Sequence, residues 1–220
     1  MEKLSVFPVR EQVAAVLRKA IFSKELAIGK ELTQEEIAKQ LGISRMPVRE
    51  AFQILERDGL LILKNNRSAV VRGLTKRDLI DHYEIRAMLE GKAAEMVSSN
   101  NKDYEEIILA HHEVEKAVAA KNVTEYISAN GAFHRAIWEA SESPRLVSLL
   151  NQLWNGLPPQ LAEFLPDQIE KSILEHNTIL EAIRSGNAVK ARDAMKDHVR
   201  RSMTDFLSYR RDIFTNSDEA

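Results

Sequence analysis

The sequence predicts a mainly α-helical protein of two domains: a small N-terminal domain with a β-hairpin, and an all-α antiparallel bundle of about six helices. Two observations lead to this prediction. Residues 1–72 contain three segments with apolar residues at helical spacing and one pair of short apolar runs. From Thr75 onward glycine and proline are scarce, and a 3.6-residue periodicity dominates. The domains are therefore expected at residues 1–72 and 73–220.

The first two helices are indicated by apolar spacing and by one capping motif. Residues 9–22 carry apolar side chains three and four positions apart, with charged residues between them. Thr33 and Glu36 then form the pattern of a capping box, in which hydroxyl and carboxylate each accept from the other residue's amide. Gly42 follows a short amphipathic helix and suits the left-handed position that ends it.

A third helix is expected from Ser44, which can cap it, to about Asp58. Pro47 falls in its first turn, where a missing amide proton costs nothing. A helix, a tight glycine turn and a second helix form a helix-turn-helix, whose second helix enters the DNA major groove with its N-terminal residues. Arg45 and Arg49 lie four residues apart, away from the apolar stripe of this helix. The alternative is that these two arginines form an ordinary solvated face.

A β-hairpin is predicted after the third helix. Residues 60–63 and 69–71 are short apolar runs that flank a polar turn at residues 64–68. Lys64 and Arg67 lie at the tip of this hairpin. A hairpin beside a helix-turn-helix is a wing, so the N-terminal domain is predicted to be a winged helix-turn-helix.

Charge and composition narrow the function classes. Residues 1–72 carry 13 Lys and Arg against 9 Asp and Glu, a net charge of +4, whereas residues 73–220 carry 18 against 24, a net charge of −6. This asymmetry suggests that only the first domain meets a polyanion. The absence of cysteine excludes disulfides, thiolate metal sites and a cysteine nucleophile. There is no secretory signal pattern and no run of about 18 apolar residues, so we expect a cytoplasmic protein without a membrane partner.

The N-terminal domain resembles a known family. The motifs that carry the resemblance are Ser44-Arg45-Met46-Pro47-Val48-Arg49-Glu50-Ala51, Leu55-Glu56-Arg57-Asp58-Gly59-Leu60 and Asn66-Arg67-Ser68-Ala69-Val70-Val71. Together they are similar to the GntR-family winged helix over about residues 8–72. The resemblance implies binding to a double-stranded DNA operator through Ser44, Arg45, Met46, Pro47, Arg49, Lys64, Asn66 and Arg67. Some relatives have a further DNA-contacting arginine near the position of Glu35 and Glu36, so the operator sequence is not implied.

The remainder of the chain predicts a helical bundle. Helices are expected at residues 75–98, 103–120, 123–140, 144–164, 167–185 and 188–213. The interior of such a bundle is a natural small-molecule pocket.

Three histidines on three of these helices lie beside apolar stripes, namely His134, His176 and His198. Asn130 precedes His134 by four residues and so shares its helix face. If the helices bring these groups together, imidazole nitrogens with an amide oxygen suit zinc, nickel or another divalent ion. The alternative is that the histidines are ordinary core or surface residues.

A second resemblance concerns this bundle. Its motifs are Arg86-x-x-Leu89-Glu90, Asn130-x-x-Phe133-His134-x-x-Ile137, Glu175-His176-x-x-Ile179-x-x-Ala182-Ile183 and Met195-x-x-His198. They resemble the FCD effector domain of the FadR subfamily over about residues 76–215. In the metal-binding branch of that family an aspartate and three histidines hold an ion. His134, His176 and His198 match the three histidines, and Asn130 stands in place of the aspartate.

The resemblance implies a divalent metal ion, with zinc as the first expectation and nickel or manganese as alternatives. An amide oxygen brings no charge, so the affinity for the metal should fall and an anionic effector should be favoured. Arg86 is a candidate anchor for a carboxylate effector. Its alternative role is an ion pair with Glu90 one helical turn later. His82, His111 and His112 match no ligand position of the family and are expected at the surface.

These interpretations combine into one expected function. The protein is expected to be a ligand-responsive transcriptional repressor, not an enzyme, that binds a palindromic operator as a homodimer and a small carboxylate in its bundle. One alternative keeps DNA binding but makes the bundle a dimerisation and structural-metal module. A further alternative is a metallohydrolase with three histidine ligands, although His134 lacks the neighbouring glutamate of His-Glu-x-x-His enzymes.

Overall fold

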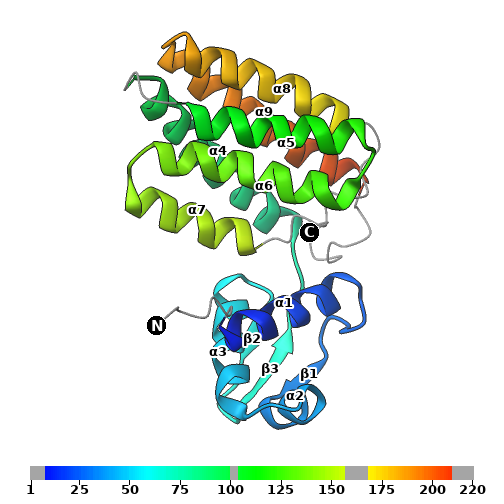
Figure 1. The fold of residues 1–220 in the computed structure, drawn as a ribbon. Coiled ribbons are helices and arrows are strands. Elements are labelled where there is room, and N and C mark those ends of the chain that lie inside the picture. Colours follow the sequence, from blue (N-terminus) through cyan, green and yellow to red (C-terminus); the bar gives the residue numbers. More distant parts are fainter. Residues whose placement is uncertain (1–7, 100–103, 157–167, 210–220) are drawn as a thin grey trace, which may run out of the picture. The chain divides into compact units, whose positions relative to one another are not determined.

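A computed structural model describes residues 8–99, 104–156 and 168–209 (Figure 1). Within these residues the chain divides into two compact units, with the boundary between Asp78 and Leu79. The first unit holds three helices and a small antiparallel sheet, and the second holds a helical bundle. The predicted fold class is therefore confirmed. The predicted domain boundary at residue 72 stays a prediction.

The first unit contains the helices and strands of a winged helix-turn-helix. They are α1 (Val9–Phe22), β1 (Glu31–Thr33), α2 (Gln34–Leu41), α3 (Arg45–Arg57), β2 (Leu61–Leu63) and β3 (Ser68–Val71). The predicted hairpin is β2 with β3, and β1 pairs with the other side of β3 to give the order β1-β3-β2. Strand β1 was not predicted from the sequence, because a three-residue strand is too short to show an alternating pattern.

Local signals decide how the helices of this unit begin and end. The capping box of α2 is present: the Glu36 amide donates to Thr33 Oγ1 at 3.2 Å, and the Glu36 carboxylate accepts from the Thr33 amide at 3.3 Å. Gly42 ends this helix at a φ of +66°. Ser44 is the N-cap of α3, but its side chain makes no capping hydrogen bond. The expected donor three residues on is Pro47, which has no amide proton.

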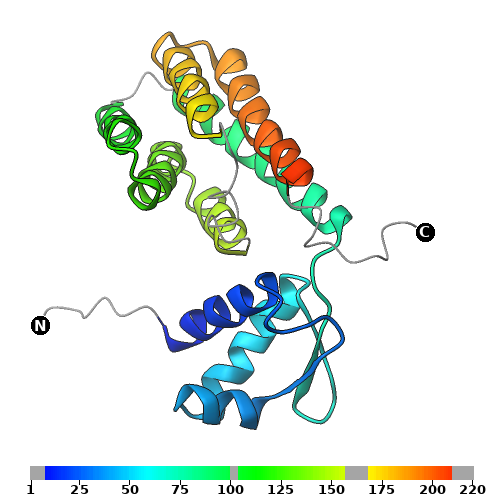
Figure 2. The same cartoon turned by 90° about the vertical axis from the view of Figure 1, so that its right-hand side faces the viewer.

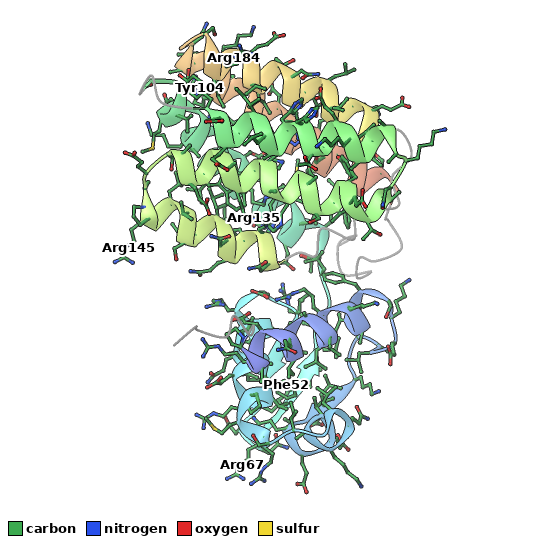
Figure 3. The ribbon with its side chains drawn as sticks, viewed as in Figure 1. Phe52, Arg67, Tyr104, Arg135, Arg145 and Arg184 are labelled. Carbon is green, nitrogen blue, oxygen red and sulfur yellow. The ribbon has the colours of Figure 1, made fainter. Side chains whose placement is uncertain are left out.

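The core of the first unit forms where α1 packs against α3. Val13 and Leu17 of α1 are buried, as are Phe52 and Leu55 of α3. Figure 3 labels Phe52 in the interior of this unit. This packing buries the apolar stripe of α3 and leaves its opposite face to the solvent.

The second unit consists of helices that follow one another along the chain as predicted. They are α4 (Lys76–Ser99), α5 (Glu105–Ala119), α6 (Val123–Ala140), α7 (Pro144–Gly156), α8 (Gln168–Arg184) and α9 (Ala188–Tyr209). The predicted helices at 144–164 and 188–213 extend into residues 157–164 and 210–213, which lie outside the described residues. Figures 1 and 2 show α5 beside α6 and α8 beside α9, as their contacts require.

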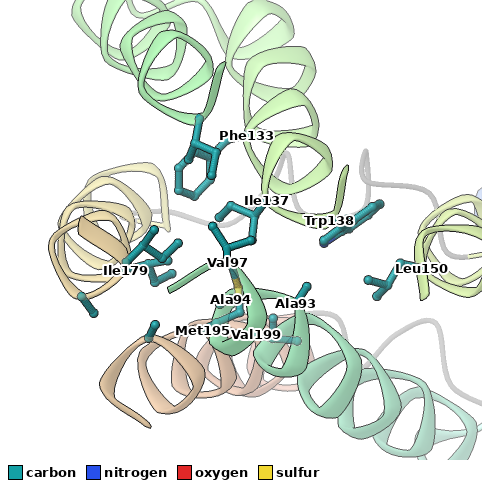
Figure 4. Close-up of a cluster of buried hydrophobic side chains, with 14 of the residues drawn as sticks. Ala93, Ala94, Val97, Phe133, Ile137, Trp138, Leu150, Ile179, Met195 and Val199 are labelled. Carbon is teal, nitrogen blue, oxygen red and sulfur yellow. The ribbon is translucent and has the colours of Figure 1, made fainter. Parts of the chain in front are cut away.

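One apolar cluster joins most of these helices. Figure 4 shows Val97 of α4, Phe133 and Trp138 of α6, Ile179 of α8 and Met195 of α9 around a common interior. All five side chains are buried. No helix among the described residues is long and apolar enough to cross a membrane.

Candidate metal centre and DNA-binding surface

Three histidines from three helices meet inside the bundle. His134 of α6, His176 of α8 and His198 of α9 are all buried. One ring nitrogen from each lies within 4.8 Å of those of the other two. The three predicted histidines therefore converge, and they do so from residues up to 64 positions apart in the chain.

The spacing of two ligand atoms matches a metal site. Nε2 of His134 lies 3.3 Å from Nε2 of His198. Two nitrogen ligands at about 2.0–2.1 Å from a tetrahedral zinc ion are separated by about 3.3–3.4 Å. A cation between two nitrogen lone pairs at this distance would replace their repulsion by attraction. The three imidazoles and the spacing of this one pair are therefore compatible with a divalent metal ion.

A carboxylate faces the other nitrogen of each of these two rings. Nδ1 of His134 lies 2.5 Å from Oε2 of Glu90 on α4. Nδ1 of His198 lies 2.6 Å from Oε2 of Glu175 on α8. From the sequence, Glu90 was expected only as a partner of Arg86, and no role was expected for Glu175. Each glutamate is on a different helix from its histidine, so no spacing along the chain could signal the contact.

Both carboxyl groups are ionised. Burial alone raises the pKa of Glu90, but the Arg86 guanidinium and His134 outweigh it and hold this pKa well below its usual range. Burial likewise raises the pKa of Glu175, and the hydrogen bonds from His198 and Arg201 outweigh it, so the pKa is about 2. Burial lowers the pKa of His198 to about 4 and that of His176 well below 6.5. Neutral imidazole, the form that binds metals, therefore predominates at His176 and His198.

Several buried polar atoms in this region lack a partner among the described residues. They are Oδ1 of Asn130, both ring nitrogens of His176 and Nε2 of His111. Asn130 lies one turn before His134 on α6. Buried polar atoms without hydrogen bonds are rare in folded proteins and often mark a missing ion, water or ligand. One metal ion could satisfy Oδ1 of Asn130 and a single nitrogen of His176, because an imidazole binds an ion through one ring nitrogen only.

Arg86 is engaged by its neighbours. Its Nε and Nη2 atoms donate to Oε1 of Glu90 at 3.0 and 2.7 Å, and its guanidinium lies 4.6 Å from the centre of a Trp154 ring. The ion pair within α4, given above as the alternative role for Arg86, is therefore present. Its role as an effector anchor stays a prediction. On the other side of the histidines, Arg201 donates to Glu175 and Asp205.

The surface prediction for the remaining histidines is wrong at His111. This residue is only 4% exposed, and its ring centre lies 6.1 Å from that of His176. It follows Ile107 by four residues and precedes Val114 by three, and both are buried, so α5 turns this face inward. That spacing was visible in the sequence. His82 is half-buried, whereas His112 is exposed as predicted.

The predicted DNA-binding residues lie on two exposed parts of the first unit. Those on α3 and its N-cap are Ser44, Arg45, Met46 and Arg49, all exposed, with Pro47 half-buried between them; those on the wing are Lys64, Asn66 and Arg67, also exposed. Arg67 has a φ of +62° and points away from the unit in Figure 3. Oδ1 of Asn66 accepts from the Ser68 hydroxyl at 2.6 Å, a contact within the wing. Exposure alone does not show that these residues contact DNA, so their role stays a prediction.

Comparisons with known proteins identify both parts of the chain. A model described as bacterial regulatory proteins, gntR family, matches residues 9–71, and the FCD domain model matches residues 81–201. The uncharacterized HTH-type transcriptional regulator YdhC of Bacillus subtilis is 33% identical over 189 residues, which are 83% of this chain and 82% of the relative. The probable D-xylose utilization operon transcriptional repressor of Paenarthrobacter nicotinovorans is 30% identical over 200 residues, which are 90% and 88% of the two chains. The solved structure of McbR/YncC from E. coli matches with a TM-score of 0.69 at 24% identity, covering 92% of this chain and 99% of its own, and so supports the fold.

Proposed function

The chain belongs to the GntR family of bacterial transcription regulators with an FCD domain, and we propose that it is a homodimeric repressor that a small carboxylate releases from its operator. Repression is supported by the D-xylose operon repressor, to which this chain is similar over most of both lengths. DNA contact is assigned to the first two turns of α3 and to the wing, where Arg45, Arg49 and Arg67 are exposed.

The proposed metal site consists of His134, His176, His198 and Asn130. The observation that carries it is the 3.3 Å separation of Nε2 atoms from His134 and His198, with the unpartnered Oδ1 of Asn130 nearby on α6. We assign zinc because three imidazoles and one amide oxygen suit a tetrahedral ion. When bound, the ion would supply a positive charge that the four neutral side chains do not cancel. A carboxylate effector is therefore favoured at this centre.

The effector would act on α4. Arg86 is proposed as its second anchor, which requires the guanidinium to exchange Glu90 for the effector. Both residues lie on α4, whose first residue, Lys76, is only five positions after the wing strand β3 ends at Val71. A carboxylate can shift the equilibrium between DNA-binding states only through a different affinity for each state.

The proposed homodimer is supported by the outward face of α4. Asp81, Ile85, Met88 and Lys92 are exposed and follow one another at intervals of four, three and four residues. In an antiparallel pair of these helices, Ile85 would meet Met88 and Asp81 would meet Lys92, so the stripe is complementary to itself. An interface with two-fold symmetry requires this property. It would let two winged helices read a palindromic operator.

A structural-metal module is the second candidate. If Asn130 completes a tetrahedral set with the three histidines, the site is closed, as structural zinc sites are. The bundle would then hold zinc without an effector. The hydrolase alternative is not proposed, because Glu90 and Glu175 each already accept from a histidine and an arginine and neither is available as a general base.

Metal content and operator binding test the proposal. Protein purified without an affinity tag is expected to hold about one zinc per chain, and the His134→Ala variant should hold none. Citrate serves as the probe carboxylate, and binding to labelled DNA from upstream of the protein's own gene is followed by fluorescence anisotropy. Citrate that lowers DNA affinity only in zinc-loaded protein supports the effector role. The structural module would be favoured if the protein binds zinc but citrate neither raises its melting temperature nor changes its affinity for DNA.

A further inference from the structure

The hydrogen bonds to Glu90 fix its role at His134. Glu90 is 0% exposed, and its Oε2 atom faces His134 Nδ1 at 2.5 Å and accepts from Trp138 Nε1 at 3.1 Å. Its Oε1 atom accepts from Arg86. Both oxygens of Glu90 thus accept from donor-only groups, so the contact with His134 is read as a hydrogen bond that Nδ1 donates. In the neutral ring, Nε2 then carries the lone pair that a metal needs.

The same arrangement recurs at His198 with a different helix. Glu175 Oε2 faces His198 Nδ1 at 2.6 Å and accepts from Arg201 Nη2 at 2.6 Å. Arg201 Nε donates to the other oxygen of Glu175 at 2.8 Å. In each pair, an arginine holds the carboxylate in place by hydrogen bonds. The carboxylate in turn orients the imidazole through its Nδ1 atom. His176 differs, because neither of its nitrogens has a partner among the described residues.

We infer that Glu90 and Glu175 are positioning residues that set the ring orientation and tautomer of His134 and His198 and so create the affinity of the centre for metal. The inference rests on the proposed metal site and names the residues that build it. Hydrogen bonds from ligating histidines to carboxylates hold the ring in place and raise its basicity. They also place negative charge next to the Nδ1 atoms of the two rings. This charge favours a cation at the centre, to which Asn130 contributes no charge.

The tautomer is measured first, in the unmodified protein without metal. Histidine ring nitrogens are observed by 15N NMR at pH 7.5, and signals are assigned with the His134→Ala and His198→Ala variants. Both Nδ1 atoms are expected to carry a proton, and both Nε2 atoms are expected to carry none. An unprotonated Nδ1 in either ring would overturn the inference. This measurement needs no change at a glutamate, so it holds even if a glutamate variant does not fold.

Zinc affinity is measured second, by competition with a chromophoric chelator. Glu90→Gln and Glu175→Gln are each expected to weaken zinc binding by about 10–100-fold. Glu84→Gln is the matched control, since Glu84 also lies on α4 and pairs with an arginine, Arg200, but has no hydrogen bond to a histidine of the described residues. Its affinity should stay within about two-fold of the unmodified protein. Equal affinities in all four proteins would overturn the inference.

The NMR signals separate positioning from general damage. Glu90→Gln should change the nitrogen shifts of His134 alone, and Glu175→Gln those of His198 alone, while His176 serves as the internal reference. Shifts at all three histidines in either variant would indicate a disturbed bundle and would count against specific positioning. Failure of the unmodified protein to bind zinc would overturn the proposed metal site. Protonation of the two Nδ1 atoms would still decide the tautomer assignment in that case.

Discussion

Single residues of the bundle tie its stability to pH. Burial, together with the nearby Arg86 charge, lowers the pKa of His82 to about 3. The unfolded chain, in which this histidine titrates near 6.5, therefore binds more protons below that pH than the folded chain does. The free energy of unfolding is therefore not reduced by His82 above pH 6.5. As the pH falls below 6.5, His82 lowers this free energy by about 1.4 kcal/mol per pH unit.

His82→Phe should reduce that slope. Urea unfolding of metal-free protein is followed at pH 7.5, 6.5 and 5.5 by tryptophan fluorescence, which reports on the bundle because Trp138 and Trp154 are the two tryptophans of the chain. The other buried histidines contribute to the slope in both proteins, so the difference isolates His82. His112→Phe is the control, because His112 is exposed. An identical slope in His82→Phe and the unmodified protein would show that His82 does not stay neutral when buried.

Arg49 tests the DNA-binding surface at the same scale. It lies exposed on α3, one turn after Arg45. Arg49→Ala is expected to weaken operator binding by about 1–3 kcal/mol if the guanidinium contacts a base. Arg184→Ala removes an equally exposed arginine from α8, labelled in Figure 3, and should leave binding unchanged. Anisotropy titrations at one salt concentration make the comparison, and equal losses in the two variants would contradict a specific role.

At the scale of helices, Gly91 determines how closely α4 can approach α9. A Cβ atom at this position would lie 2.9 Å from Lys196 Cγ and 3.0 Å from the Arg192 carbonyl oxygen. The lysine side chain can move, but the backbone oxygen cannot move without the helix. Gly91→Ala should therefore destabilise the bundle by about 1–3 kcal/mol through overpacking, reduced by the better helix propensity of alanine.

Gly131 provides the matched control for that substitution. It too lies inside a helix, α6, but a Cβ there would meet the flexible end of Arg135 at 3.2 Å and a Trp154 carbon at 3.5 Å. Gly131→Ala is expected to be neutral or stabilising by up to about 1 kcal/mol. Thermal unfolding of both variants measures the difference. A Gly91→Ala variant at least as stable as Gly131→Ala would mean that α4 and α9 can separate without cost.

At the scale of the whole molecule, DNA binding is expected to depend on the outward face of α4. Ile85 is 43% exposed and Met88 is 52% exposed. Met88→Glu would place a charge opposite Ile85 of a second copy in the proposed interface, so the dimer should dissociate and operator affinity should fall by at least about ten-fold, or 1.4 kcal/mol. Light scattering after size exclusion measures the mass. Leu174→Glu, on an exposed position of α8, is the control and should leave the mass unchanged. If Met88→Glu remains a dimer, the dimer interface does not lie on this face of α4.

Much of this architecture was predictable from the sequence, because its signals are local. Capping at Thr33, termination at Gly42 and the helical period of the bundle each depend on residues within one or two turns of one another. The convergence of His134, His176 and His198 was predicted from their position beside apolar stripes and from the family resemblance. The capping hydrogen bond expected from Ser44 is absent, and the reason is also local, since Pro47 stands at the donor position.

The sequence by itself determined the two-part fold and the family, because periodicity, caps and motifs depend on neighbouring residues. It also predicted the residues that are proposed to contact DNA or a metal. Only the tertiary structure decided which side chains face each other across helices. Glu90 meets His134 from 44 residues away, Glu175 meets His198 from 23, and His111 packs against His176. Such contacts depend on how whole helices pack against each other. The spacing of residues along the sequence does not specify how two helices are aligned.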